Sequence, residues 1–146
     1  MIRVIALLCC CAAILAAQSD DSSCCRMTIT VEPPAVLNVG ITILGETPVT
    51  LFDSTPARDL HLNVVSNTGR ESDRTAYGKR LLTERRASRN INRELKKGDT
   101  FPEKLDLREI YVLTPGTYHV TVSRYVQVSD RDVTLRAQID LTIPSS

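Results

Sequence analysis

The chain has 146 residues, and its 18 Lys and Arg nearly balance its 17 Asp and Glu, which leaves a formal net charge of +1. This balance excludes the strong field that draws basic proteins to nucleic acid or to a membrane surface, and the length suits a single domain. The chain has no Trp and only two Phe, so its core must be built from Val, Leu and Ile.

The first 17 residues have the pattern of a secretory signal peptide. Arg3 supplies a positive charge, and the apolar run VIALLCCCAAILAA follows over residues 4–17. A basic start, a short apolar region and small residues at its end are typical of an export signal. The run is shorter than the roughly 20 residues of a membrane-spanning helix, and no lipoprotein signal precedes Cys9 or Cys24. We expect a secreted or periplasmic protein that begins at Gln18 and has no membrane span, with an uncleaved membrane anchor as the alternative.

Removal of the signal changes the charge and the cysteine content. The mature chain has 17 basic residues (18 minus 1) against 17 acidic ones, so its formal charge is zero. Its two cysteines, Cys24 and Cys25, are adjacent in QSDDSSCCR, residues 18–26, which we expect to be a disordered leader. An adjacent pair closes only a strained ring and is too small a set for zinc. Two interpretations stay open: unpaired thiols in a tail, or an intermolecular disulfide in an oxidising compartment.

From residue 26 onward, apolar and polar residues alternate between turn signals. In the first run, for example, Met27, Ile29 and Val31 share one face. Such period-2 runs predict antiparallel strands that each bury one face. The predicted strands cover residues 26–32, 36–45, 48–53, 59–65, two stretches of 91–107 around a turn at 97–99, a run from 117, and 133–143 after a hairpin turn at 128–133.

These strands predict an all-β protein, an antiparallel β-sandwich of about seven strands over residues 27–146. No window has a sustained helical period. The nearest is YGKRLLTERRASRNI, residues 77–91, where the apolar residues do not form a continuous stripe. LDLREIY, residues 105–111, is expected to hold one helical turn with Asp106 as its N-cap.

A turn and a tyrosine stand together in LTPGTYHVTV, residues 113–122. Pro115 presets φ for the first central position of a turn, and Gly116 tolerates the positive φ that a type II turn needs next. Tyr118 then lies where immunoglobulin-like sandwiches keep a tyrosine corner, with its hydroxyl bonded back to nearby backbone. Ordinary core packing is the alternative role for this side chain.

The segment ELKKGDTFPEKLDLREIYVLTPGTYHVTVSR, residues 94–124, resembles a phrase of secreted bacterial immunoglobulin-like domains. It is similar to the non-catalytic domain of deuterolysin-like metallopeptidases and to the intracellular proteinase inhibitor family of bacilli. The resemblance implies an immunoglobulin-like fold and no particular function, since sandwiches host many roles. A deuterolysin-like peptidase needs His-Glu-x-x-His, but His61 and His119 have no such neighbours.

The sequence does not predict an enzyme. His61 and His119 lie in predicted strands on the face opposite the apolar residues, and the chain has neither a Gly-x-Ser-x-Gly elbow nor a Gly-rich phosphate loop. Asp130 and Asp132 flank the predicted hairpin turn, where solvated carboxylates are usual, and a Ca²⁺ site there needs further oxygen ligands. We expect no catalytic residue, cofactor or metal.

One segment is strongly basic. Residues 70–97 contain ten Lys and Arg against four Asp and Glu. On an exposed loop they predict a patch for an acidic protein or an anionic surface polymer, whereas on an edge strand they protect against unwanted pairing. Nucleic acid is not expected, because Tyr77 alone is available for stacking. The candidate patch residues are Arg80, Arg85, Arg86, Arg89 and Arg93.

Two functions are therefore compatible with the sequence. The first is an exported, non-catalytic binding or structural module that recognises another envelope or extracellular protein. The alternative is an inhibitor of a secreted peptidase that presents the loop 70–90, with Arg85 and Arg86 in an acidic pocket of the enzyme.

Overall fold

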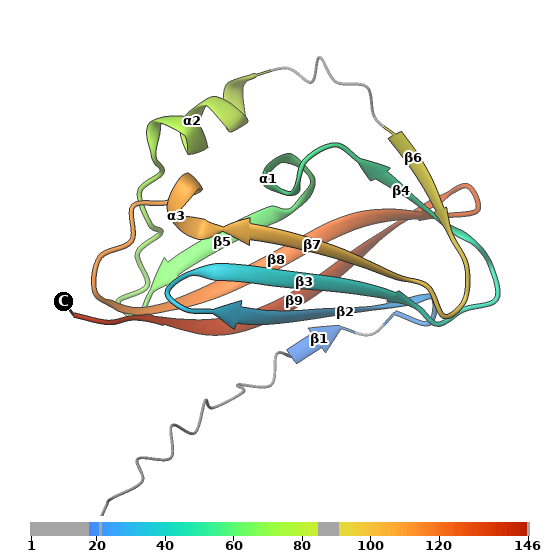
Figure 1. The fold of residues 1–146 in the computed structure, drawn as a ribbon, viewed down its shortest axis with the longest axis horizontal. Helices are drawn as coiled ribbons and strands as arrows, with labels where there is room; N and C mark the ends of the chain where they lie inside the picture. Colours follow the sequence, from blue (N-terminus) through green and yellow to red (C-terminus); the bar gives the residue numbers. More distant parts are fainter. Residues whose placement is uncertain (1–17, 21, 85–90, 146) are drawn as a thin grey trace, which may run out of the picture.

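A computed structural model describes residues 18–20, 22–84 and 91–145. It has two antiparallel β-sheets, with three short helices gathered on one side of the sandwich (Figure 1). The prediction of an all-β, immunoglobulin-like antiparallel β-sandwich is confirmed. The predicted signal peptide, residues 1–17, lies outside the described residues. The strands are β1 (Gln18–Asp20), β2 (Cys25–Glu32), β3 (Val36–Ile43), β4 (Val49–Asp53), β5 (His61–Ser66), β6 (Ile91–Leu95), β7 (Thr100–Asp106), β8 (Gly116–Val128) and β9 (Arg131–Ile143).

The larger sheet has the order β1-β9-β8-β4-β6, with β5 also paired to β8, and the smaller sheet has the order β2-β3-β7. Strands β8 and β9 form a long hairpin whose ladder closes at Val128 and Arg131, at the predicted turn. Ser129 in this turn has a φ of 54°. The predicted turn at 97–99 is also present, and it carries the chain from β6 in the larger sheet to β7 in the smaller one.

The core lies between the two sheets and consists mainly of aliphatic side chains. The smaller sheet contributes Met27 and Ile41, and the larger sheet contributes Val120, Val122 and Leu135, all fully buried. Each comes from a strand whose burial alternates residue by residue. The period-2 pattern of the sequence therefore marks the buried faces directly.

Tyr118 makes the predicted tyrosine corner. Its hydroxyl donates to the carbonyl of Thr114 at 2.8 Å and accepts from the amide of the same residue at 3.0 Å. Gly116 has the expected positive φ, but its value of 149° is larger than the roughly 80° of a type II turn. Glycine can adopt either angle. The strand β8 thus begins at the glycine itself.

The expectation of a disordered leader over residues 18–26 is wrong for its described part. Residues Gln18–Asp20 form β1 and pair with β9, and β2 begins at Cys25. The physical reason is that Cys25 continues the alternation of β2: its side chain is fully buried, as is that of Met27, and it pairs with Ile43. The polar residues before it obscure this inward position.

Three short helices connect strands: α1 (Pro56–Asp59), α2 (Ala76–Thr83) and α3 (Leu107–Ile110). The predicted helical turn at 105–111 is confirmed as α3, and the carboxylate of Asp106 caps it by accepting from the amide of Arg108 at 3.0 Å. Helix α2 was not expected, because it docks through a glycine and carries no apolar stripe. Among the described residues, no helix is long and apolar enough to cross a membrane.

Candidate functional site

Two charged residues occupy inward positions of the sandwich. In β8, Arg124 follows Val120 and Val122 on the buried face, and in β7, Glu103 precedes Leu105 on the buried face. Both side chains are 4% exposed. A buried charge is costly unless it is paired, so the partners of these residues decide what the cluster can do.

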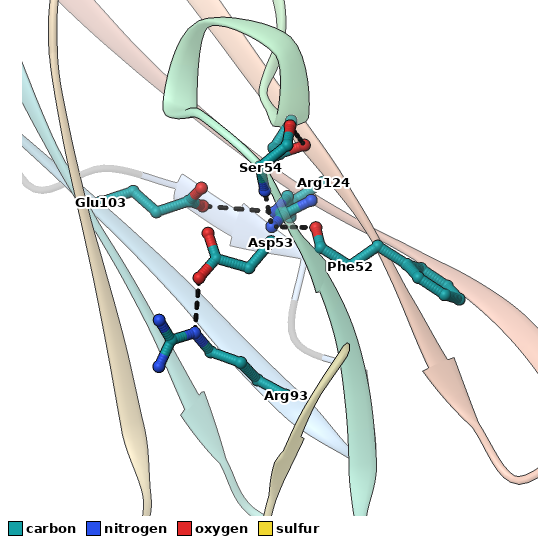
Figure 2. Close-up of polar contacts among 7 residues, drawn as sticks. Phe52, Asp53, Ser54, Arg93, Glu103 and Arg124 are labelled. Atoms are coloured by element: carbon teal, nitrogen blue, oxygen red, sulfur yellow. Dashed lines mark hydrogen bonds and ion pairs between the residues drawn. The ribbon is translucent and has the colours of Figure 1, made fainter. Parts of the chain in front are cut away.

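Arg124 joins the two sheets and the segment that follows β4 (Figure 2). Its Nη2 donates to the carbonyl of Phe52 at 3.0 Å and lies 3.7 Å from Oδ2 of Asp59. Its Nε lies 3.3 Å from Oε2 of Glu103, an ion pair without the alignment of a hydrogen bond. One cation thus faces two buried carboxylates.

The strand register explains why an arginine is placed here. Pairing of β8 with β5 ends at Ser123, and pairing with β4 begins at Gln127. Arg124 stands in the gap between the two partner strands, and it reaches the carbonyl of Phe52 in the part of β4 beyond that pairing. Between Ser123 and Gln127 the partner of β8 changes from β5 to β4, and the guanidinium supplies a hydrogen bond where the ladder is interrupted. This role is structural.

Asp59 is held by the turn that contains α1. Its Oδ2 accepts from the amide of Ser54 at 2.6 Å, and its Oδ1 accepts from the hydroxyl of the same residue at 2.7 Å. The side chain is 3% exposed. Ser54 and Arg124 together compensate this carboxylate, so it closes the loop between β4 and β5.

Glu103 is less well compensated. The pKa of Glu103 is raised from 4.5 to about 7, chiefly by burial. The guanidinium of Arg124 opposes this increase, and the nearby carboxylates of Asp59 and Asp53 contribute to it. A carboxyl group that titrates near neutrality suits proton transfer. Here, however, it is closed off between the sheets, so substrate has no access to it.

The basic candidates do not form one cluster in the described residues. Arg80 lies on α2 with its guanidinium over the ring of Tyr77, at 5.9 Å from the centroid. Arg93 lies on β6, donates to the carboxylate of Asp53 (Figure 2) and sits over the ring of Phe101. Figure 1 shows α2 and β6 well apart. Arg85, Arg86 and Arg89 lie outside the described residues.

Two other basic residues of this segment have local partners. Lys97 pairs with Glu46, and Arg74 lies over the ring of Tyr111 at 4.9 Å from its centroid. Part of the proposed inhibitory loop 70–90 is helical, because α2 occupies residues 76–83. The described basic residues of this segment are thus spread over a helix, an edge strand and the segments beside them.

A groove lies between α2, α3 and the start of β5. It has a volume of about 310 Å³, and Arg58 and Glu84 form an ion pair of 2.8 Å among its lining residues. Leu82 in its wall is 67% exposed. We call this the α2 groove; its lining residues are Ala57, Arg58, Leu60, His61, Leu62, Arg74, Leu81, Leu82, Glu84 and Ile110.

Helix α2 is fixed in place by close contact with α3. Thr75 caps α2 by accepting from the amide of Gly78 at 3.0 Å, and its own amide donates to the carbonyl of Ile110 at 2.8 Å. A Cβ on Gly78 would lie 2.2 Å from that same carbonyl oxygen. Only glycine permits this approach, so the groove wall rests on a defined packing contact.

The two cysteines lie at the start of β2. Cys25 is fully buried and Cys24 is half-buried, and their Sγ atoms are 2.9 Å apart. Burial, together with the contact with Cys24, raises the pKa of the Cys25 thiol to about 12. Of the two, only Cys24 is accessible for an intermolecular disulfide, one of the two interpretations that the sequence left open.

The histidines lie where the sequence predicted them. His61 and His119 are exposed residues of β5 and β8, and Nδ1 of His119 lies 2.9 Å from Oδ1 of Asp140 on the outer face. No three His, Cys, Asp or Glu side chains in the described part of the chain come together as a candidate metal site.

Comparison with known proteins adds no family assignment. No protein-family model matches the chain, and no curated protein matches it. The resemblance of residues 94–124 to bacterial immunoglobulin-like domains therefore stays a prediction.

Sequence reasoning missed the buried charges and the α2 groove. A signal for the charges was present, because Arg124 continues the inward series 118, 120, 122 and Glu103 stands two residues before Leu105. A charge at an inward strand position indicates a buried pair or a break in the sheet. The groove had no such signal, since its residues come from four separate segments.

Proposed function

We propose that the chain is an exported, non-catalytic β-sandwich module that binds another envelope or extracellular protein through the α2 groove. The observation that carries this proposal is the exposed apolar wall of the groove: Leu82 is 67% exposed on a helix held rigidly against the sandwich. Large apolar side chains beside a cavity are typical of protein interfaces.

The chemistry of the groove favours a partner with an apolar anchor and a nearby acidic group. The leucines of β5 and α2 offer apolar contact, while the guanidinium of Arg74 borders the groove and is engaged by an aromatic ring rather than by a carboxylate. Export follows from the predicted signal peptide, and the proposal of a non-catalytic role is supported by the exposed histidines and by the structural use of the buried charges.

The test is photo-crosslinking in cells that produce the protein. A photoreactive amino acid replaces Leu82 at the groove or, as the control, Tyr125, which is 51% exposed on β8. We expect a discrete protein adduct from position 82 only, and we expect Arg74→Glu to weaken it. Equal adducts from both positions, or none from position 82, would overturn the proposal.

A further inference from the structure

The geometry at the start of β2 points to a modification site: we propose that Cys24 and Cys25 form a disulfide with each other, closed by a disulfide oxidant. The inference rests on the placement of the two sulfurs and is independent of the α2 groove. It differs from both interpretations that the sequence left open, which were free thiols in a tail and a bond between chains.

The first argument is proximity. The two Sγ atoms are 2.9 Å apart, and the hydroxyl of Ser22 lies 3.0 Å from Sγ of Cys24. A nucleophile already in contact with its target reacts at a far higher effective concentration than a second molecule can provide. Once Cys24 is activated, Cys25 is therefore its nearest partner.

The second argument is that the backbone around the pair is fixed. The carbonyl of Cys24 accepts from the amides of Leu44 and Gly45 at 2.8 and 3.0 Å, and the amide of Cys25 donates to the carbonyl of Ser22 at 3.3 Å. A Cβ on Gly45 would lie only 3.3 Å from Cα of Cys24. These contacts hold both cysteines at the edge of the folded sandwich instead of in a mobile tail.

The third argument is the unequal exposure of the two thiols. Cys24 is half-buried and can meet an oxidant, whereas Cys25 is 0% exposed and cannot reach another chain. Burial also raises the pKa of the Cys25 thiol, so this thiol is the poorer first nucleophile. One residue is placed to start the exchange and the other to finish it.

The reaction is a two-step thiol–disulfide exchange. The Cys24 thiolate attacks one sulfur of a small disulfide, forms a mixed disulfide and releases one thiolate, which takes up a proton. Cys25 then loses its proton and attacks Sγ of Cys24, and the second thiolate leaves and is protonated. Two cysteine thiols are oxidised to one disulfide, while the oxidant is reduced to two thiols.

The product is a strained ring that is easily reduced. Adjacent Cα atoms are about 3.8 Å apart across a trans peptide, less than the roughly 4.4 Å lower limit of most disulfides. We therefore expect the bond to reopen under milder reductant than an unstrained disulfide needs. While Cys24 and Cys25 are joined, neither sulfur is free to form a disulfide with a second chain.

The test uses the full chain, purified in reductant and then exposed to oxidised glutathione. After quenching and unfolding in N-ethylmaleimide, digestion with trypsin and a protease that cuts before Asp isolates DSSCCR, residues 21–26, which contains no other cysteine. We expect this peptide to be unlabelled and lighter by two hydrogen atoms, with both labels gained after reduction. A persistent glutathione adduct, two linked peptides, a link to residues 9–11 or two labels without reduction would each overturn the proposal.

Two variants separate the roles of the cysteines. In Cys24→Ser, the buried Cys25 should remain a free thiol under the same treatment. In Cys25→Ala, Cys24 should keep a glutathione adduct or form dimers, because the second attack is lost. A modified Cys25 in folded Cys24→Ser, or an unmodified Cys24 in folded Cys25→Ala, would contradict the assigned order of attack. The peptide mass of the unmodified chain tests the ring even if a variant fails to fold.

Discussion

Two arginines reach the end of β4 from opposite environments. Arg124 contacts it from the interior, with its side chain 4% exposed, and Arg93 contacts it from the edge strand β6, with its side chain 51% exposed (Figure 2). Each has an acidic partner, Asp59 for the first and Asp53 for the second. The two pairs therefore isolate the effect of burial.

The difference shows that similar contacts have unequal energetic weight. Around Arg124 the loss of hydration has already occurred on folding, so removal of the cation leaves the carboxylates of Asp59 and Glu103 buried without a cationic partner. Arg93 and its partner are partly exposed, so water largely replaces the contact that is lost when the arginine is removed. The following substitutions test this contrast, from the largest expected effect to the smallest.

Arg124→Ala is expected to have the largest effect. Among the described residues, it removes the only cationic partner of Glu103 and Asp59, and breaking a buried pair costs about 3–5 kcal/mol. Urea unfolding followed by circular dichroism measures the loss. The double variant Arg124→Met with Glu103→Leu should lose less stability than Arg124→Ala. A loss below about 1 kcal/mol for Arg124→Ala would contradict the assigned role.

Glu103→Gln is expected to change how stability depends on pH. The pKa of Glu103 is raised from 4.5 to about 7 by burial, so the stability that its neutral form contributes is present below about pH 4.5 and is lost as pH rises through about 7. Gln stays neutral. The stability of the variant relative to the parent should therefore rise by about 1–3 kcal/mol between about pH 5 and about pH 8.

Glu32→Gln is the matched control for this pH experiment. The hydrogen bond and charge of Lys104 lower the pKa of the exposed Glu32 carboxyl, so its contribution is present at neutral pH and is lost on acidification. The Gln variant should show a small dependence of the opposite sign. A parallel pH profile for the two variants would show that burial of Glu103 is not the cause.

Tyr118→Phe tests a buried neutral group, and we expect its effect to lie between those of the buried Arg124 and the exposed Arg93. The change removes the hydrogen bonds between the hydroxyl and Thr114 but keeps the ring in the core, and we expect a loss of about 1 kcal/mol. Tyr125→Phe, at an exposed position, is the control and should be neutral. Unfolding curves of equal midpoint for the two variants would rule out a stabilising tyrosine corner.

Arg93→Ala is expected to have the smallest effect. Its pair with Asp53 is half exposed to solvent on the arginine side, so the loss should stay below about 1 kcal/mol and shrink further at high salt. Unfolding at low and at high ionic strength measures both. A loss as large as that of Arg124→Ala would remove the contrast between interior and edge.

The strands, the β8–β9 turn, the α3 cap and the tyrosine corner could all be predicted because each depends on neighbours in the sequence. Alternation is a local property, and so are the turn chemistry of residues 128–133 and the cap at Asp106. Helix α2 could not be found in this way, since its docking depends on the bare backbone of Gly78 against Ile110, a contact between residues distant in the chain.

The candidate site was predicted less well, because it depends on which segments meet. The basic residues were visible as a count, but whether each is paired, stacked or exposed follows from partners such as Asp53 and Glu46. For Cys24 and Cys25, adjacency in sequence did not reveal that β2 begins at the second and buries it.

The sequence by itself determined an antiparallel sandwich, its strand faces and most of its turns, since these follow from side-chain period and backbone preference within a few residues. The tertiary structure decided the rest: the gap between β4 and β5 that Arg124 fills, the raised pKa of Glu103, the α2 groove and the contact of the two sulfurs. The first three arise from desolvation or proximity between distant segments, and the last depends on the burial of Cys25 at the start of β2. Such effects exist only once the chain has folded.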